Sequence, residues 1–286
     1  MADGHLTKTP LESVYAGVVS MRGLRLCLFL AELQGLECFS TDIGNAFLES
    51  TTNEKCCIIA GEEFGELKGH LLIFYKSRNG YKTSGARFTK LLGQFLEDEM
   101  NFVKAKVEDE IYMRKSADGT RWEYLCTYID DLLFAVDDPA LFIAQVKECF
   151  MLKGTEPTQH HLGCDFGRDD DGTLFMDPSG YITRMEESYM THLEVKPKAP
   201  KRNSPLEKND HPEIDVSEFL GEDDILLYQS LIGSMQWAII TLGRFDVNAA
   251  VMTMSSFRSQ PRKGHLERVK QMIGYLSKFK HFKIRF

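Results

Sequence analysis

The chain has 286 residues, of which 43% are apolar and 27% charged, and a formal net charge of −8. These values are ordinary for a folded globular protein and exclude disordered, collagen-like and coiled-coil chains. The seven cysteines include no Cys-x-x-Cys pair and lie mostly in apolar runs, so we interpret them as reduced core residues of an intracellular protein.

Membrane insertion and secretion are not expected. No apolar run approaches the roughly 20 residues of a membrane helix, and the first twelve residues are too polar for a secretory signal. The charge is uneven, because residues 257–286 hold nine Lys or Arg but a single acid, Glu267. This basic tail allows local binding of a polyanion, although a solvated helix face explains it equally well.

The first third of the chain is predicted to contain a helix, two strands and a loop. Apolar residues recur every three to five positions over residues 11–36, as in a helix packed on one face, and Gly35 is placed to end it. Residues 37–43 and 55–60 are predicted strands, the first with Asp42 near its end, and a loop follows over residues 61–69.

The middle of the chain alternates helices with a hairpin. A helix is predicted over residues 84–100, with Ser84 as its cap. Residues 110–114 and 122–129 should pair as an antiparallel hairpin around a turn at Asp118-Gly119. The second of these strands leads through Asp130-Asp131 into the apolar run 132–136, and a helix follows over residues 139–150.

The last part of the chain is predicted to be mostly helical. A hairpin joins residues 161–166 to residues 173–176, and a helix begins near Tyr181. A linker is expected over residues 196–212, since it is rich in proline and basic residues. Helices are expected over 228–240, over 246–257 with Asp246 as cap, and over 264–279. In the last helix one apolar stripe should be buried, with Arg268, Gln271 and Lys278 facing away.

The most unusual local feature is the pair Asp130-Asp131 between two apolar strands. Adjacent carboxylates repel each other, and such a turn solvates them poorly, so the arrangement is costly without a cation. A hard divalent ion such as Mg²⁺ suits it. The alternative is an exposed hairpin turn. Asp42, at the end of an earlier strand, favours the metal site, because neighbouring strands would bring the three carboxylates together as two-metal phosphoryl transfer requires.

Three motifs occur in a fixed order: Thr-Asp-Ile-Gly-Asn-Ala-Phe-Leu at 41–48, Ser-Gly-Ala-Arg-Phe at 84–88, and Tyr-Ile-Asp-Asp at 128–131. Together they resemble the successive signature motifs of reverse transcriptases. Leu152-Lys153-Gly154 followed by His161-Leu162-Gly163, with segments 228–234 and 265–276, resembles copia-type retrotransposon polyproteins. The resemblance covers nearly the whole chain, from about Pro10 to the end.

The resemblance implies an α+β fold, a right-hand polymerase palm made of an antiparallel sheet with packed helices. Residues 1–36 would be a partial fingers region. Residues 37–180 would be the palm, with the catalytic carboxylates and the primer-grip hairpin, and residues 181–286 a helical, thumb-like or connection-like region with a basic C-terminal helix. The implied activity is RNA-directed DNA polymerisation, with an RNA template, a DNA primer and deoxynucleoside triphosphates as partners.

The resemblance also assigns roles to individual residues. Asp42, Asp130 and Asp131 would hold two Mg²⁺ ions, with Mn²⁺ as a substitute, and Lys153 would protonate the leaving pyrophosphate. The nucleotide would be bound by Ile43, Phe47, Ser84, Gly85 and Arg87. The primer and template would be bound by Leu162, Gly163, Arg262, Lys263 and Arg268. Phe47 would exclude a ribose 2′-hydroxyl, or would simply be a core aromatic.

The chain also departs from the family pattern. The basic fingers strand that precedes the first motif, the ribonuclease H segment and the integrase segment are absent from these 286 residues, and Tyr81 and Phe88 replace the usual Leu and Trp. Two alternatives therefore stay open: a catalytically inactive, truncated nucleic-acid-binding remnant of the same polyprotein, and a palm-type nucleotide cyclase. A cytoplasmic location, in a virus-like particle, or a nuclear one is expected.

A zinc site is not expected at His160, His161, Cys164 and Asp165. Their spacing matches no usual zinc pattern, and strand alternation would place His161 and Cys164 on opposite faces. We interpret these residues as core or hairpin positions.

Overall fold

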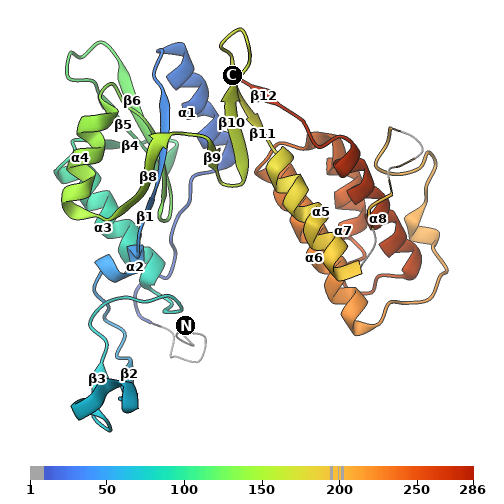
Figure 1. Ribbon diagram of the computed structural model, residues 1–286, viewed down its shortest axis with the longest axis horizontal. Coiled ribbons are helices and arrows are strands. Elements are labelled where there is room, and N and C mark those ends of the chain that lie inside the picture. Colours follow the sequence, from blue (N-terminus) through green and yellow to red (C-terminus); the bar gives the residue numbers. More distant parts are fainter. Residues whose placement is uncertain (1–9, 194–195, 199, 201–202) are drawn as a thin grey trace. The chain divides into compact units, whose positions relative to one another are not determined.

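The computed structural model describes residues 10–193, 196–198, 200 and 203–286 (Figure 1). The chain divides into two compact units, Met1–Thr158 and Gln159–Phe286, which are described separately. This division lies 22 residues before the palm boundary predicted at residue 180. The predicted primer-grip hairpin therefore belongs to the second unit.

The first unit is built on a six-stranded sheet in the order β4-β5-β6-β7-β1-β8. Every neighbouring pair of strands in it is antiparallel, as predicted. Its strands are β1 (Cys38–Ile43), β4 (Val103–Ala105), β5 (Glu108–Lys115), β6 (Trp122–Tyr128), β7 (Asp131–Ala135) and β8 (Leu152–Pro157). The position of β1 between β7 and β8 brings together residues that are 89 to 118 positions apart in sequence.

Helices cover both faces of this sheet (Figure 1). On one face, α3 (Ser84–Asp98) and α4 (Pro139–Cys149) enclose the main core, which includes Phe88, Leu125, Leu132, Phe134 and Phe142. On the other face lies α1 (Met21–Leu33), which packs against β5 and β6. Strand alternation explains this, because Leu125 of β6 belongs to the main core while its neighbour Cys126 lies beside Cys27 of α1.

Helix α1 is shorter than the predicted helix over residues 11–36. It begins at Met21, where the Ser20 hydroxyl accepts a hydrogen bond from the Gly23 N–H. Just before it, Val18 forms a bridge with Tyr128 of β6, and the Val19 N–H donates to the Thr127 carbonyl at 2.9 Å. The predicted end is confirmed: Gly35 has φ +67°, and the Leu36 N–H donates to the Ala31 carbonyl.

A two-stranded arm extends from the first unit (Figure 1). It consists of β2 (Cys57–Ile59) and β3 (Leu71–Ile73), joined by a 3-10 helix, η2 (Glu62–Leu67), where a loop was predicted. Its apolar side chains are largely solvent-exposed, with Ile59 at 74% and Ile73 at 75%. The short helix α2 (Ala46–Glu49) follows β1.

The second unit combines a four-stranded sheet with helices. The sheet order is β12-β11-β10-β9. Its elements are β9 (His160–His161), β10 (Cys164–Arg168), β11 (Leu174–Asp177), α5 (Ser179–Leu193), η3 (Pro212–Ile214), α6 (Glu222–Ile240), η4 (Phe245–Val247), α7 (Asn248–Ser255), α8 (Lys263–Lys278) and β12 (Ile284–Arg285). Because β11 pairs with the C-terminal strand β12, and α5 packs against β10, the hairpin is tied to the helical unit.

Three local predictions are wrong. The α3 cap is Thr83, and the Ser84 hydroxyl donates to the Arg78 carbonyl instead. Asp246 does not cap α7, because its carboxylate pairs with the buried Arg244 guanidinium and α7 begins two residues later. His161 and Cys164 face the same side, since the tight turn between them makes them partners across β9 and β10. Both are buried, as expected of core residues.

No helix in the described ranges combines the length and the apolarity that a membrane crossing demands.

The left-handed conformation of Gly35 gives a stability prediction. Gly35→Ala should lower the free energy of unfolding by about 1 kcal/mol, because a Cβ disfavours positive φ. Urea denaturation followed by circular dichroism measures the change. The matched control is Gly233→Ala, in α6, where a Cβ meets open space and should raise the helix stability by about 0.5–1 kcal/mol. Equal effects of both substitutions on the free energy of unfolding would contradict the left-handed conformation of Gly35.

Candidate active site

The register of β1 brings together the residues of the candidate site. Asp42 is the direct partner of Asp131 on β7 and of Lys153 on β8. Direct partners in an antiparallel sheet project their side chains to the same face. The strand ends therefore present two carboxylates and an ammonium group side by side. The convergence of the carboxylates was predicted from the sequence, and the position of the lysine was not.

Asp130 lies in the two-residue turn between β6 and β7. Its carbonyl accepts a hydrogen bond from the Ile43 N–H at 2.9 Å, which ties the turn to the end of β1. The other turn residue, Ile129, has φ +59°, an unfavourable conformation for a β-branched side chain. Ile129 packs against the main core, and this packing holds the turn in place.

The three carboxyl groups perturb one another. Burial raises the pKa of Asp131 to about 6, and the charges of Asp130 and Asp42 add to the effect. Burial and then the Asp42 charge also raise the pKa of Asp130, whereas Lys153 acts in the opposite direction. At neutral pH the site thus concentrates negative charge in a poorly solvated place, which is the situation that a bound cation relieves.

Lys153 is the internal cation of this site. Its Nζ lies 3.6 Å from Asp42 Oδ2, with both side chains partly exposed. Gly44, at the end of β1, leaves room for it, since a Cβ there would come within 3.0 Å of the lysine Cε. The predicted catalytic lysine is therefore placed directly beside the predicted catalytic carboxylates.

The carboxylates are not arranged as a finished metal site. Among the residues that the structure describes, no three His, Cys, Asp or Glu side chains are grouped so that all could ligate one ion. The donor chemistry nevertheless fits Mg²⁺, because carboxylate oxygens on neighbouring strand ends are the ligands that this ion prefers. Asp42, Asp130 and Asp131 are the residues that would hold such an ion.

The predicted nucleotide-binding residues near β1 occupy two environments. The Ile43 side chain is 1% exposed and belongs to the main core, on the face opposite Asp42. Only its backbone is available at the site, and its N–H is already bonded to the Asp130 carbonyl. Phe47, on α2, is partly buried and meets Phe88 edge to face at 6.4 Å. This packing matches the core-aromatic alternative and leaves part of the ring accessible.

The predicted nucleotide-binding residues at the start of α3 are covered by other parts of the chain. Arg87 pairs with Glu12 and also donates to the Thr51 carbonyl. A Cβ on Gly85 would approach the Ala16 Cβ to 2.9 Å, so the extended N-terminal segment crosses the helix there. The cap residue Thr83 donates its N–H and its hydroxyl to Glu54.

In the second unit, the predicted primer-grip residues form a tight turn. Leu162 and Gly163 both have positive φ, +48° and +88°, and they connect β9 to β10. Gly163 lies close to the side chains of Tyr181, Leu242 and Trp237. A left-handed leucine is unusual, because its Cβ disfavours this conformation, so the turn is held by its surroundings.

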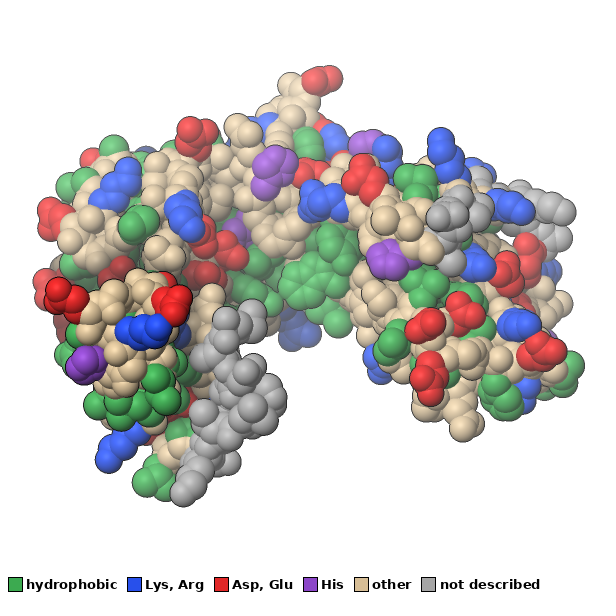
Figure 2. Space-filling model, turned by 60° about the horizontal axis from the view of Figure 1, so that its bottom comes forward, with side chains coloured by type: hydrophobic (Ala, Val, Ile, Leu, Met, Phe, Trp, Pro, Cys, Tyr) green, Lys and Arg blue, Asp and Glu red, His purple; other side chains and the backbone are tan. Residues whose placement is uncertain are grey.

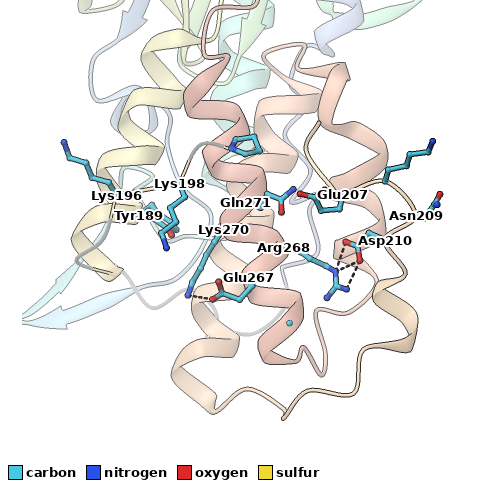
Figure 3. A pocket seen from close by; sticks show the side chains of 13 residues that line it. Tyr189, Lys196, Lys198, Glu207, Asn209, Asp210, Glu267, Arg268, Lys270 and Gln271 are labelled. Atoms are coloured by element: carbon cyan, nitrogen blue, oxygen red, sulfur yellow. Dashed lines mark hydrogen bonds and ion pairs between the residues drawn. The ribbon is translucent and has the colours of Figure 1, made fainter. Parts of the chain in front are cut away.

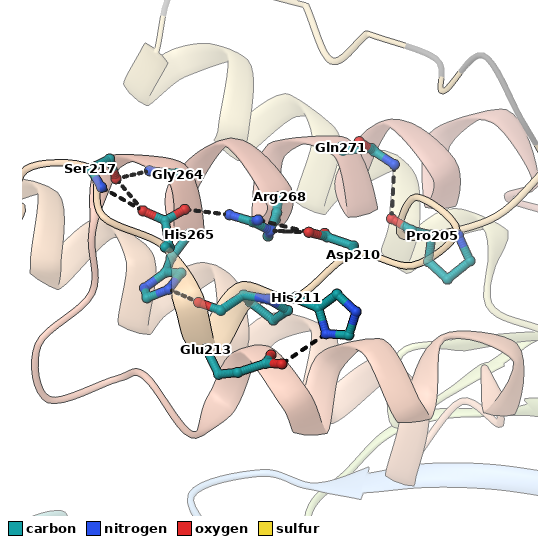
Figure 4. A network of polar contacts seen from close by, with 11 residues as sticks. Pro205, Asp210, His211, Glu213, Ser217, Gly264, His265, Arg268 and Gln271 are labelled. Atoms are coloured by element: carbon teal, nitrogen blue, oxygen red, sulfur yellow. Dashed lines mark hydrogen bonds and ion pairs between the residues drawn. The ribbon is translucent and has the colours of Figure 1, made fainter.

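The predicted template-binding cations on α8 are engaged within the unit. Arg268 binds Asp210 at 2.7 Å and Asp215 at 2.6 Å (Figure 4). Lys263 pairs with Glu218, and Arg262 stacks 3.8 Å above the Phe219 ring. The predicted outward orientation of Arg268 is therefore wrong, because the segment that precedes α6 runs along this side of α8 and supplies acidic partners.

Charge pairing extends over much of the basic tail. Lys283 and Arg285 both pair with Asp169, in the turn between β10 and β11, and Lys270 pairs with Glu267. Figure 2 shows acidic and basic side chains intermixed over the helical unit on the face in view. The tail that is basic in sequence is thus partly neutralised in space.

The second unit contains a cavity of about 910 Å³ between α8, α5 and the segment around residues 196–210 (Figure 3). Three lysines line it without an ion pair to a described residue: Lys196, Lys198 and Lys208. The other charged side chains in its wall include the Arg268–Asp210 and Lys270–Glu267 pairs.

Several contacts were not foreseen from the sequence. Glu12 and Glu54 reach the start of α3 from segments 75 and 29 residues away, and Asp210 and Asp215 reach α8 from more than 50 residues away. Nothing in the local sequence signals such pairs, because each acid lies in a polar, aperiodic segment.

Comparison with known proteins links the chain to retroelements. It is 24% identical to a putative transposon Ty5-1 protein of Saccharomyces cerevisiae, over 82% of this chain and 74% of the relative. It is 26% identical, over 93% of its length, to the retrovirus-related Pol polyprotein from transposon TNT 1-94 of Nicotiana tabacum. It is 22% identical, over 92%, to that from transposon RE1 of Arabidopsis thaliana.

The chain spans 20% and 17% of the two plant polyproteins. No protein-family model matches it. The similarities to yeast and plant retroelement proteins support an origin of the chain in a retrotransposon polyprotein.

The raised pKa of Asp131 predicts a pH-dependent effect on stability. A carboxyl group whose pKa is higher in the folded state contributes stability below pH 4 that is lost as the pH rises to about 6. Asp131→Asn should therefore be more stable than the unmodified chain at pH 7.5, by about 1–2 kcal/mol after solvent screening. The advantage should shrink at pH 4.

Urea midpoints at both pH values test this. Asp109→Asn, which removes an exposed carboxyl group from β5 of the same unit, is the control for loss of charge. If the extra stability of Asp131→Asn is the same at both pH values, the pKa of the Asp131 carboxyl group is not raised in the folded chain.

Proposed function

We propose that this chain is the RNA-directed DNA polymerase segment of a copia-type retrotransposon polyprotein, with a palm-type sheet in its first unit. The observation that carries the proposal is the register of Asp42 with Asp131 and Lys153 at adjacent strand ends. It is supported by the ordered motifs and by the similarity to retroelement polyproteins.

The carboxylates supply the metal-binding part of the proposed mechanism. Two bound Mg²⁺ ions would lower the pKa of the primer 3′-hydroxyl and stabilise negative charge on the α-phosphate. Asp42 and Asp131 share one face of the sheet, and Asp130 is held beside them by its bond to the Ile43 N–H. Because these carboxylates repel one another in a partly buried place, a bound divalent cation would stabilise their charged forms more than the surrounding water does.

Lys153 supplies the acid of the proposed mechanism. Its ammonium group, 3.6 Å from Asp42, stands beside the carboxylates, where it would donate a proton to the pyrophosphate oxygen that leaves. Phe47 would lie against the sugar, Arg87 against the template or nucleotide, and the Leu162-Gly163 turn against the primer end. The exposed fraction of the Lys153 side chain, 61%, leaves it free to move toward a substrate.

A second candidate function is a non-catalytic, nucleic-acid-binding fragment of the same polyprotein. The observation that favours it is the lack, within the described residues, of a preassembled group of three metal ligands. In this case the carboxylates would remain without supporting nucleotide addition.

Nucleotide incorporation on a DNA-primed RNA template with Mg²⁺ distinguishes the two. We expect incorporation by the unmodified chain and by Asp109→Asn, and a loss of at least 100-fold in Asp130→Asn/Asp131→Asn, because removing metal ligands removes charge stabilisation in the transition state. Template binding without incorporation by any variant would favour the non-catalytic fragment. Nucleotide turnover that needs no primer would instead indicate the cyclase.

Metal binding can be tested without turnover. Mg²⁺ at ten times its Kd should stabilise the unmodified chain by about 1.4 kcal/mol, because only the folded carboxylates bind it. The Tm should rise with Mg²⁺ or Mn²⁺ and should not rise in Asp42→Asn. Asp109→Asn should retain the shift, and an equal shift in Asp42→Asn would show that the metal binds elsewhere.

A further inference from the structure

Glu12, in the segment before α1, forms an ion pair with Arg87 at the start of α3. The Glu12 carboxylate binds Arg87 Nη2 through one oxygen and accepts from Asn53 Nδ2 through the other, at 2.7 Å. On its far side the same guanidinium donates to the Thr51 carbonyl at 3.1 Å. Arg87 is thus fixed by the backbone at one nitrogen and by a carboxylate at the other.

These groups line a cleft of about 700 Å³. Its wall includes Arg87, Lys90, Asn53 and the backbone around Thr51, together with the acids Glu12 and Glu49. Hydrogen bonds from Asn53 and Arg87 lower the pKa of Glu12, and Lys90 acts in the same direction. The cleft is therefore built to hold an anion, and the anion now in it is a side chain of the chain itself.

The segment that carries Glu12 is held by few other contacts. Leu11 is fully exposed and Tyr15 is 76% exposed, so little apolar surface is buried before Ala16. Attachment to the sheet begins at Gly17, which is buried, and at Val18 and Val19, which pair with Tyr128 and Thr127 of β6. Release of the Glu12 carboxylate would therefore free residues 11–15 without disturbing the core.

We propose that the cleft is a phosphate-binding site and that Glu12 is a built-in competitor for it. A phosphate group can accept from Arg87 Nη2 and from Asn53 Nδ2 through two of its oxygens, as the Glu12 carboxylate does, and it carries more charge. Asn53 and Lys90 provide further donors. As far as the phosphate belongs to a template strand or a nucleotide, the inference rests on the proposed function.

The competition has a directional consequence. While Glu12 neutralises Arg87, an incoming phosphate meets an occupied cation and a like charge. Once phosphate displaces it, the segment over residues 11–15 moves off the start of α3 and the contact of Ala16 with Gly85 is loosened. Glu12 thus weakens binding to the site until a ligand of sufficient charge arrives.

The test compares Glu12→Gln with Glu187→Gln in the full chain. Both substitutions remove one negative charge, and Glu187 is an exposed residue of α5 in the other unit. Fluorescence anisotropy of a labelled RNA–DNA duplex at 50 mM salt measures binding. We expect Glu12→Gln to bind three- to tenfold more tightly than Glu187→Gln, and Glu12→Gln/Arg87→Gln to lose this gain.

Inorganic phosphate and a deoxynucleoside triphosphate, tested by calorimetry on the same variants, identify the source of the phosphate. A gain with the duplex alone assigns the cleft to a nucleic-acid backbone, and a gain with the triphosphate assigns it to the nucleotide. Either result supports the site. Equal binding by Glu12→Gln and Glu187→Gln for all three probes overturns it, as does a gain that survives Arg87→Gln.

The outcome is independent of the proposed activity. The binding assays need no turnover, so a chain that never incorporates nucleotide can still show the gain in Glu12→Gln. Conversely, incorporation that depends on Asp130 and Asp131 combined with no gain in binding by Glu12→Gln would support the proposed activity and overturn the phosphate site. A Tm of Glu12→Gln within about 2 °C of that of Glu187→Gln, as expected for an exposed residue, confirms that both variants are folded.

Discussion

The placement of β1 between β7 and β8 is the constraint on which the candidate site depends. A shift of one residue in this register would turn Asp42 to the opposite face and separate it from Asp131 and Lys153. Ile43 prevents such a shift, because its side chain is buried in the main core and its N–H is bonded to the Asp130 carbonyl. A hydrophobic contact on one face therefore sets the position of the charged groups on the other.

This arrangement reduces the stability of the first unit. The site gathers three carboxyl groups, one with a pKa raised to about 6, and pairs one of them, Asp42, with Lys153; it adds a left-handed isoleucine at the hairpin turn. Backbone strain of this kind costs roughly 1–3 kcal/mol and persists only where packing enforces it. Groups that destabilise a fold are characteristic of functional sites, and here they occur together at one strand end.

The sequence was sufficient to predict the local elements of the site. Apolar runs on either side of Asp130-Asp131 predicted β6 and β7, and a strand that ends near Asp42 was also predicted. The partners of the charged residues could not be predicted, because they come from distant segments. Arg268 was expected to face solvent, yet Asp210 and Asp215 lie against it. The helix predicted over residues 11–36 fails over its first ten residues for a related reason, because Val18 and Val19 pair with the distant strand β6 instead.

Internal ion pairs therefore determine what binding can achieve in this chain. Asp42 is paired with Lys153, Arg87 with Glu12, and Lys263 with Glu218, so these three charges, which are proposed to contact a metal or a nucleic acid, already have a partner. A ligand must exchange one of these pairs for its own contact, and the net gain is the difference between the two. Phosphate and Mg²⁺ carry more charge than the side chains they would replace, which gives them the advantage. Basic residues of the tail that stay paired with acids neutralise no phosphate groups. The salt dependence of nucleic-acid binding should therefore be weaker than the number of basic residues in the tail suggests.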